Sequence, residues 1–305
     1  MMNLEIVVPC YNEERNIKKF YSELNVTLDR NIDWKVIFVD DGSLDNTLET
    51  IKSLNKDNIR YLSFSRNFGK EAAIYAGLNK TTADYVILMD ADLQDPPSLI
   101  PEMLSNINSH DIVATRRVTR TGEPRIRSFF ARQFYKIMNR FSDIDLVDGA
   151  RDFRLMKRYV VDSILDLEEY NRFSKGIFQW VGFDTKWIEY KNIQRNDGET
   201  SWSFWQLFKY SVEGIVSFTV APLHISTVIG IIFSIIAFIA ILFIIIRTLI
   251  FGDPVSGWPS TISVILFIGG IQLFTIGILG QYLAKTYIEV KKRPKYIIKE
   301  DNLEG

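Results

Sequence analysis

Residues 85–97 read YVILMDADLQDPP, a short apolar run that ends in two aspartates at alternate positions. The apolar segment Tyr85–Met89 predicts a buried strand. Asp90 and Asp92 follow it directly, so both carboxylates can approach one divalent ion beyond the strand end. A D-x-D match alone is common, and here it gains weight from the strand before it and from Gln94-Asp95-Pro96-Pro97 after it.

Outward from this segment, short apolar strands alternate with helices. Strands are predicted at residues 4–8, 35–39, 59–63, 85–89 and 111–114. One helix is predicted from the N-cap Asn12 to about Leu28, a second follows the strand at 35–39 and ends at Leu54, and a third covers Lys70–Asn79. Continuous apolar strands with helices between them imply a mostly parallel sheet that is covered on both faces. The predicted fold class is therefore α/β.

Polar residues cluster at three of these strand ends. The clusters are residues 9–13 (PCYNE), the pair Asp40-Asp41, and residues 90–92 (DAD). Ligands of open α/β folds bind beyond the carboxyl ends of the strands. The three clusters therefore predict a single site at one edge of the sheet.

Composition narrows the chemistry of that site. A formal net charge of −1 over 305 residues gives no global field for a nucleic acid. The single cysteine, Cys10, excludes an intramolecular disulfide and fits a reducing compartment, and no signal peptide is expected before the first strand. The two histidines, His110 and His224, are far apart in sequence, which argues against zinc. We expect a hard, oxygen-bound metal, Mg²⁺ or Mn²⁺.

Several other kinds of site do not match the sequence. Gly69-Lys70 is followed by Glu71 and lacks the upstream glycine of a P-loop, and no G-x-G-x-x-G follows the first strand. Neither histidine lies near a nucleophile motif, which argues against a Ser-His-Asp arrangement.

The C-terminal third has a different composition. Residues 204–218 carry apolar residues at helical spacing and predict a helix lying in a membrane interface. Val228–Ile246 and Ile262–Ala284 lack charges, and each is long enough to cross a hydrocarbon core of about 30 Å. The short loop between them, residues 251–259, lacks Lys and Arg, whereas six basic residues follow the second segment. The positive-inside rule then places both termini in the cytoplasm.

Four regions are predicted on this basis. They are a catalytic domain over residues 1–203, an interfacial helix region over 204–226, two transmembrane helices within 227–284 (about 228–250 and 262–284), and a basic cytoplasmic tail over 285–305.

Motifs along nearly the whole chain resemble family 2 glycosyltransferases with the GT-A fold, in the polyprenyl-phosphate branch similar to dolichol-phosphate mannose synthase. The matching segments are residues 7–14 (VVPCYNEE), 38–43 (FVDDGS), 65–71 (SRNFGKE), 89–97 (MDADLQDPP), 152–156 (DFRLM), 171–176 (NRFSKG), 257–258 (GW) and 289–294 (EVKKRP).

The resemblance implies roles for individual residues. Those implied to bind the nucleotide-sugar are Pro9, Tyr11, Glu13, Val39, Asp41, Asp90, Ala91 and, as a phosphate contact, Arg195. Those implied to bind the metal are Asp92 and Gln94. The implied catalytic set is Asp92, Asp152, Arg116 after the fifth strand, and Arg125, Arg127 and Arg132 as candidates for gripping the lipid phosphate.

Two positions depart from the family pattern. Arg151 stands where many members have a glycine before Asp-Phe-Arg-Leu-Met. Ser201 stands where many members have a lysine, which removes a cation near the expected phosphate site. The contacts of the acceptor at that position are therefore left open.

The predicted function is inverting transfer of a sugar, glucose or N-acetylglucosamine, from a nucleotide diphosphate donor, with UDP expected, to undecaprenyl phosphate at the cytoplasmic membrane face. A lipid phosphate with a second pKa of about 6 is largely ionised near neutrality and needs little help from a base. Asp152 is then favoured as an orienting group over a base. The implied partners are donor, lipid acceptor and bilayer, with no nucleic acid, and homo-oligomer formation is left open.

Two other functions are kept as alternatives. A membrane glycosyltransferase acting on a diacylglycerol or polysaccharide hydroxyl would require a true base. A non-catalytic nucleotide-sugar sensor or scaffold would not need the leaving-group metal implied by Asp90, Asp92 and Gln94.

Overall fold

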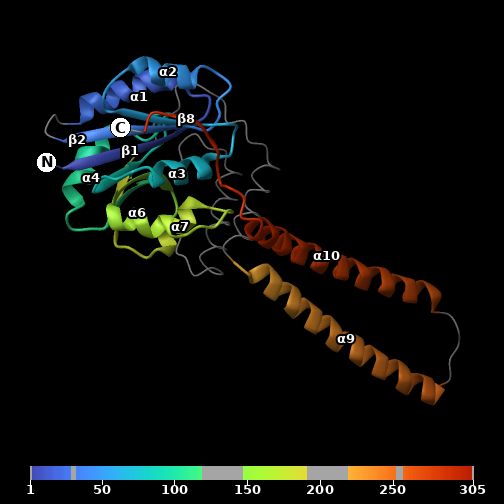
Figure 1. Cartoon of the computed structure of the whole chain (residues 1–305). Coiled ribbons are helices and arrows are strands. Elements are labelled where there is room, and N and C mark those ends of the chain that lie inside the picture. The colour runs from blue at the N-terminus through green and yellow to red at the C-terminus, as the bar shows by residue number, and fades with distance from the viewer. Residues whose placement is uncertain (1, 29–31, 119–146, 191–218, 252–256, 304–305) are drawn as a thin grey trace. The chain divides into compact units, whose positions relative to one another are not determined.

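The structure is a computed structural model that describes residues 2–28, 32–118, 147–190, 219–251 and 257–303 (Figure 1). The chain forms two compact units. The first comprises Met1–Gln206 together with Lys292–Gly305, and the second comprises Leu207–Lys291.

The first unit is built on a mixed sheet. In the described part of the chain it has eight strands in the order β7-β5-β6-β4-β1-β2-β3-β8. Their bounds are β1 Asn3–Cys10, β2 Asp33–Asp40, β3 Ile59–Phe64, β4 Tyr85–Leu88, β5 Ile112–Arg117, β6 Ala150–Lys157, β7 Thr185–Tyr190 and β8 Ile298–Asp301. The strands β4, β1, β2 and β3 run parallel, as do β5 and β7, whereas β6 and β8 are antiparallel to their neighbours. The predicted α/β fold with a mostly parallel sheet is confirmed.

Helices cover both faces of this sheet. They are α1 Glu14–Thr27, α2 Thr47–Leu54, α3 Lys70–Asn79, the 3₁₀ turn η1 Pro97–Leu99, α4 Ile100–Asn106, α6 Arg158–Leu165 and α7 Ser174–Trp180. Alternate residues of β1 point to opposite faces. Ile6 and Val8 join the core formed with Phe20 of α1, whereas Val7 faces Gly77 of α3.

The second unit contains two long helices, α9 Ala221–Phe251 and α10 Trp258–Val290, which form a hairpin (Figure 1). At 31 and 33 residues and 1.5 Å per residue, each is long enough to cross a bilayer core of about 30 Å. Apolar, outward-facing stretches of membrane-spanning length cover Ala221–Ala240 and Phe267–Val290. The rings of Phe233 and Phe267 meet edge to face at 5.4 Å between the two helices.

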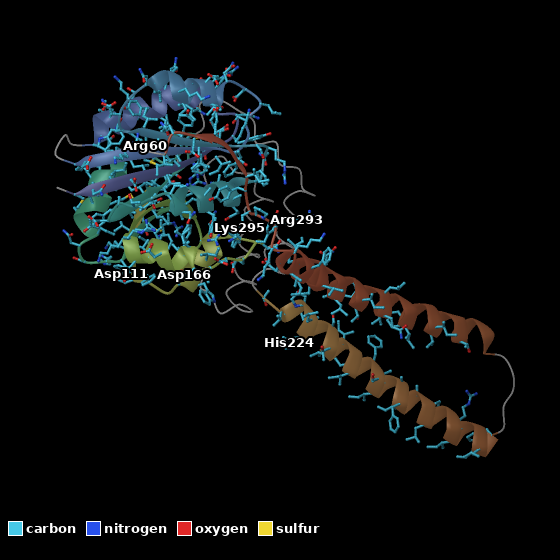
Figure 2. All side chains as sticks on the ribbon, viewed as in Figure 1. Arg60, Asp111, Asp166, His224, Arg293 and Lys295 are labelled. Carbon is cyan, nitrogen blue, oxygen red and sulfur yellow. The ribbon has the colours of Figure 1, made fainter. Side chains whose placement is uncertain are left out.

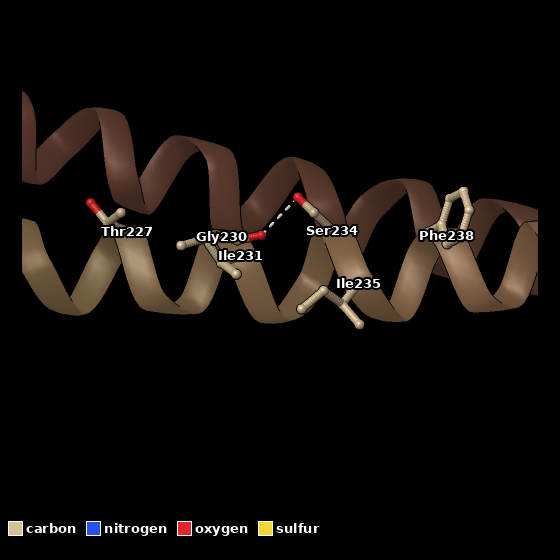
Figure 3. A pocket seen from close by; sticks show the side chains of 6 residues that line it. All are labelled: Thr227, Gly230, Ile231, Ser234, Ile235 and Phe238. Carbon is tan, nitrogen blue, oxygen red and sulfur yellow. Dashed lines mark hydrogen bonds between the residues drawn. The ribbon is translucent and has the colours of Figure 1, made fainter.

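A shallow apolar groove of about 460 Å³ lies on α9 (Figure 3). It is lined by Thr227, Gly230, Ile231, Ser234, Ile235 and Phe238. The predicted spans 228–250 and 262–284 fall within α9 and α10. The predicted interfacial helix over residues 204–218 lies outside the described residues.

The segment after α10 returns to the sheet of the first unit. β8 pairs antiparallel with β3, and the main-chain N–H of Ser65 donates to the carbonyl of Ile297 at 2.9 Å. The ring of Tyr296 stacks on Phe64 at 5.1 Å, and Lys295, labelled in Figure 2, lies over the ring of Tyr75 at 4.0 Å. Part of the predicted basic tail is therefore an edge strand of the domain formed by the N-terminal 200 residues.

Gly77 sets how closely α3 approaches the sheet, and this gives a test of the packing. A Cβ atom at this position would lie 2.3 Å from Val7 Cγ1. We expect Gly77→Ala to lower the free energy of unfolding by about 1–3 kcal/mol, because overpacking forces the core to shift. Thermal unfolding of the full chain in detergent measures this. Asn79→Ala, at an exposed position of the same helix, is the control and should change stability by less than about 0.5 kcal/mol. Equal melting temperatures for the two variants would contradict the packing argument.

Candidate functional site

A pocket of about 380 Å³ opens where β1, β2 and β4 end and α3 begins. Its lining residues are Pro9, Cys10, Tyr11, Glu13, Asp41, Asn67, Gly69, Lys70, Ala73, Asp90, Ala91 and Asp92. The three polar clusters that follow strands in the sequence thus contribute to one pocket. Of the residues implied to bind the nucleotide-sugar, Val39 is buried in the core and Arg195 lies outside the described residues, while the other six line the pocket.

Asp41 shapes one wall of this pocket. Its carboxylate accepts the main-chain N–H of Phe68 at 2.7 Å and that of Gly69 at 2.9 Å, which fixes the loop between β3 and α3. Gly42, with a φ of +66°, allows this loop to come close, because a Cβ there would lie 2.4 Å from the carbonyl carbon of Arg66. Burial raises the pKa of Asp41, although the two amides act in the opposite direction.

Lys70 joins two carboxylates from different strands. Its ammonium lies 2.7 Å from Asp90 Oδ1 and 2.6 Å from Asp152 Oδ2. The side chains of Asp90 and Asp152 are 21% and 13% exposed, whereas the side chain of Lys70 is 46% exposed. Burial lowers the pKa of Lys70, but the two carboxylates outweigh it and raise that pKa above its ordinary value.

The two carboxylates respond differently to this arrangement. Burial raises the pKa of Asp90 despite the nearby Lys70. For Asp152, burial acts to raise the pKa, but Lys70 and Lys175 together outweigh it and hold the pKa well below its usual range. The pKa values of the two carboxylates are therefore shifted in opposite directions, that of Asp90 upward and that of Asp152 downward.

The segment after β4 carries the residues implied to bind metal. Asp92 lines the pocket, and its carboxylate accepts the main-chain N–H of Gln94 at 3.1 Å across Leu93, which has a left-handed φ of 56°. The side-chain oxygen of Gln94 accepts a hydrogen bond from Arg117 at 2.8 Å and retains a second lone pair.

These oxygen ligands fit a hard divalent cation that also binds a phosphate group of a bound molecule. Among the described residues, no group of three or more His, Cys, Asp or Glu side chains is arranged to hold a metal alone. Mg²⁺ commonly binds through one or two carboxylates together with substrate phosphates, and Asp92 and Gln94 offer oxygen atoms of that kind.

Asp95 anchors a second cluster behind this segment. It is 1% exposed, accepts Arg151 Nε at 3.0 Å and accepts the hydroxyl of Tyr190, while Arg117 Nη2 lies 3.9 Å away. Burial and the neighbouring Asp95 raise the pKa of Tyr190 to about 12. Arg151, at the position where the family resemblance led us to expect glycine, thus neutralises a buried carboxylate.

The predicted arginines are placed differently from one another. Arg116 donates to the carboxylate of Glu189 on β7, whereas its neighbour Arg117 contacts Gln94. The other predicted arginines, Arg125, Arg127, Arg132 and Arg195, lie outside the described residues.

Sequence reasoning did not assign roles to several basic residues that surround Asp152. Arg154 is fully buried, lies 3.5 Å from the ring centre of Phe178 and donates to the carbonyl of Arg151 at 2.8 Å. Burial lowers the pKa of Arg154 to about 9, with Asp152 opposing it. Lys175 is the second residue of α7, and burial lowers its pKa. Lys70 and Lys175 lie in two of the motifs that carry the resemblance, 65–71 and 171–176, which was the available signal.

Comparison with known proteins identifies close relatives of the chain. Residues 5–165 match the family Glycosyl transferase family 2. The prophage bactoprenol glucosyl transferase homolog of Escherichia coli K12 is 42% identical over 98% of this chain and 99% of its own length. The SfII prophage-derived bactoprenol glucosyl transferase of Shigella flexneri is 41% identical over 99% of both chains. A solved structure of glucosyl-3-phosphoglycerate synthase from Mycobacterium tuberculosis has 16% identity and a TM-score of 0.49, covering 70% of this chain and 78% of that one.

The role of Asp41 in shaping the pocket can be tested by removing its carboxylate. Asp41→Ala leaves the amides of Phe68 and Gly69 without their acceptor, and an unpaired buried polar group costs about 1–3 kcal/mol. We expect the affinity for UDP, the nucleotide expected from the sequence, to fall about tenfold or more, measured by calorimetry. Asp57→Ala, at an exposed position, serves as the control. Unchanged UDP affinity in Asp41→Ala would show that the loop holds its shape without this contact.

Proposed function

The chain belongs to glycosyl transferase family 2, and on that premise we propose that it transfers glucose from UDP-glucose to a polyprenyl phosphate at the cytoplasmic face of the membrane. The observation that carries this proposal is the pocket in which Asp90, Asp92 and Lys70 meet, in a chain that also contains two apolar helices of membrane-spanning length. Relatives named bactoprenol glucosyl transferase, aligned over nearly their full length, support glucose over N-acetylglucosamine and a polyprenyl phosphate over a hydroxyl acceptor.

The pocket residues divide the work of binding the donor. Tyr11, Glu13 and Asp41 lie on the side formed by β1 and β2 and would hold the base and ribose, while Asp90 and Ala91 would line the nucleotide. Asp92 and Gln94 would hold Mg²⁺ or Mn²⁺. When bound, the ion supplies positive charge to the departing nucleotide diphosphate.

Binding of the acceptor requires positively charged side chains as well as space beside the donor. A phosphate group brought beside the donor's diphosphate places two anions close together, which like-charge repulsion opposes. Guanidinium groups suit phosphate oxygens because they donate in a planar fork. Arg116, Arg125, Arg127, Arg132 and Arg195 remain the candidates for these contacts.

The position of the hairpin in the chain supports a cytoplasmic site. α9 and α10 lie in sequence between β7 and β8, and both of these strands belong to one sheet. Because the chain leaves this domain before α9 and returns to it after α10, the start of α9 and the end of α10 must both lie on the membrane side where the domain is. Lys285, Lys291, Lys292, Arg293 and Lys295 cluster there, and residues 251–257 contain no Lys or Arg, so the positive-inside rule assigns that side to the cytoplasm.

The role of Asp92 can be tested on the purified protein in detergent. We expect Asp92→Ala to reduce transfer of labelled glucose from UDP-glucose to undecaprenyl phosphate by about 100-fold or more, as loss of a group that stabilises developing charge does. The Mg²⁺ dependence of UDP binding, followed by calorimetry, should also disappear, while thermal unfolding stays unchanged. Asp57→Ala is the control. Full transfer activity in Asp92→Ala would remove this residue from the metal site.

The membrane orientation can be tested by cysteine labelling in intact cells. In a Cys10→Ser background, which has no other cysteine, we introduce Ser256→Cys in the loop or Glu304→Cys in the tail. In intact cells, a membrane-impermeant maleimide should label the loop cysteine and not the tail cysteine. The tail cysteine should react only after the cells are opened. Labelling of the tail in intact cells would reverse the proposed orientation.

A further inference from the structure

Two loops that are hydrogen-bonded to each other form the pocket wall on the side of β1 and β2. The first loop, residues 11–14, follows β1 and begins α1, and the second, residues 41–47, follows β2 and begins α2. Tyr11 and Glu13 of the first loop and Asp41 of the second line the pocket. The positions of these three side chains therefore depend on how the two loops are held together.

Three consecutive main-chain N–H groups of the first loop donate to side chains of the second loop. The donors are the N–H groups of residues 12, 13 and 14, and their acceptors are Ser43 Oγ at 3.0 Å, Thr47 Oγ1 at 2.8 Å and Asp45 Oδ2 at 3.3 Å, respectively. The main-chain N–H of Thr47 donates to Asp45 Oδ1 at 3.0 Å, which fixes two of these acceptors relative to each other. The start of α1 is thus held by side chains that come from a separate loop.

The second loop donates back to the first at two points. The main-chain N–H of Leu44 donates to Asn12 Oδ1 at 2.9 Å, and that of Asn46 donates to Glu14 Oε2 at 2.8 Å. Asn12 therefore bonds two adjacent residues of the facing loop, Ser43 through its main chain and Leu44 through its side chain. A pair of bonds in opposite directions fixes both the separation and the orientation of the two loops.

Asn12 also has the backbone conformation that this junction needs. Its φ is 56°, in the left-handed region that asparagine tolerates better than most residues with a side chain. Gly42, with a φ of +66°, has the same position relative to the end of β2. Asn12 is exposed and does not line the pocket, although its neighbours Tyr11 and Glu13 do. Its side chain therefore acts on the pocket through these neighbours.

The following inference rests on the proposed function, which makes the ligand of this wall the nucleoside half of a nucleotide-sugar. We propose that Asn12 is a positioning residue for that nucleoside. Through its bonds to Ser43 and Leu44 it holds the two loops together before the donor arrives. The side chains that line this wall are thereby placed without help from the ligand.

A preformed wall increases affinity because the ligand does not have to organise it. When only a fraction of the molecules has the two loops joined, the apparent dissociation constant rises by the inverse of that fraction. The net contribution of one hydrogen bond corresponds to a change of about three- to tenfold in such an equilibrium. The nucleoside is bound in the same way before and during transfer. Separation of the loops should therefore raise KM for the donor and leave kcat unchanged.

The first experiment removes the side chain of Asn12 and keeps its backbone conformation. Asn12→Gly retains a left-handed φ and takes the acceptor away from the Leu44 N–H. We expect the dissociation constants of UDP and UMP, measured by calorimetry on the full chain in detergent, to rise by the same factor of about three- to tenfold, since both ligands carry the nucleoside. A rise for UDP with unchanged UMP affinity would place the effect at the diphosphate and overturn the inference.

A matched control for this variant lies at the end of α2. Asn55 is exposed and has a left-handed φ of 42°, so Asn55→Gly makes the same substitution in the same backbone conformation away from the pocket. Its UDP affinity should equal that of the wild type. Wild-type UDP affinity in Asn12→Gly as well would overturn the inference alone, whereas absence of UDP binding to the wild-type protein would contradict the proposed function.

The second experiment measures transfer and approaches the same contact from the facing loop. Asn12→Gly should raise KM for UDP-glucose by about three- to tenfold and keep kcat within about twofold of wild type. Ser43→Ala, which removes the acceptor of the Asn12 N–H, should have the same effect, and Ser43→Thr, which keeps a hydroxyl, should restore the wild-type KM. A fall in kcat with unchanged KM in Asn12→Gly and Ser43→Ala would overturn the inference, as would a KM in Ser43→Thr as high as in Ser43→Ala.

Discussion

The antiparallel insertion of β6 between β5 and β4 is the constraint on which the site depends. Parallel strands bring the ends of β1, β2 and β4 to one edge, where they form much of the wall of the pocket. Reversing one strand brings the start of β6, 60 residues after Asp90, to the same edge. Asp152 is thereby brought to Lys70, a residue that lines the pocket.

Neutralisation of buried charge organises the residues around this edge. Lys70 serves Asp90 and Asp152, and Arg151 serves Asp95, each at hydrogen-bonding distance. Removing one partner of such a pair leaves a charge without compensation, which costs far more than the pair contributes. The positions of the acidic residues after β4 are therefore tied to basic residues contributed by α3, β5 and β6. Such pairing holds the acidic side chains at this edge in fixed positions.

The sequence predicted the parts of this arrangement that are local. Short apolar runs marked the first five strands, and the polar residues that follow three of them lie together, because parallel strands end at a common edge. The partner of Asp152 was not predictable in this way, since it depends on the register between β4 and β6. β8 was missed because IKED is four residues long and three of them are charged, so it has no apolar run. Arg151 was noticed as a departure from related sequences, and its explanation required the buried position of Asp95.

The return of the chain to the sheet after α10 has a consequence for biosynthesis. Chains emerge from the ribosome from the N-terminus onward, so β3 is complete more than 230 residues before β8 is made. Until then β3 is the outermost strand on its side, with unpaired main-chain groups of the kind that recruit other chains. Both helices of the hairpin, α9 and α10, are synthesised before the strand that covers this edge. The outer edge of β3 therefore stays open to other chains until almost the whole sequence has been made.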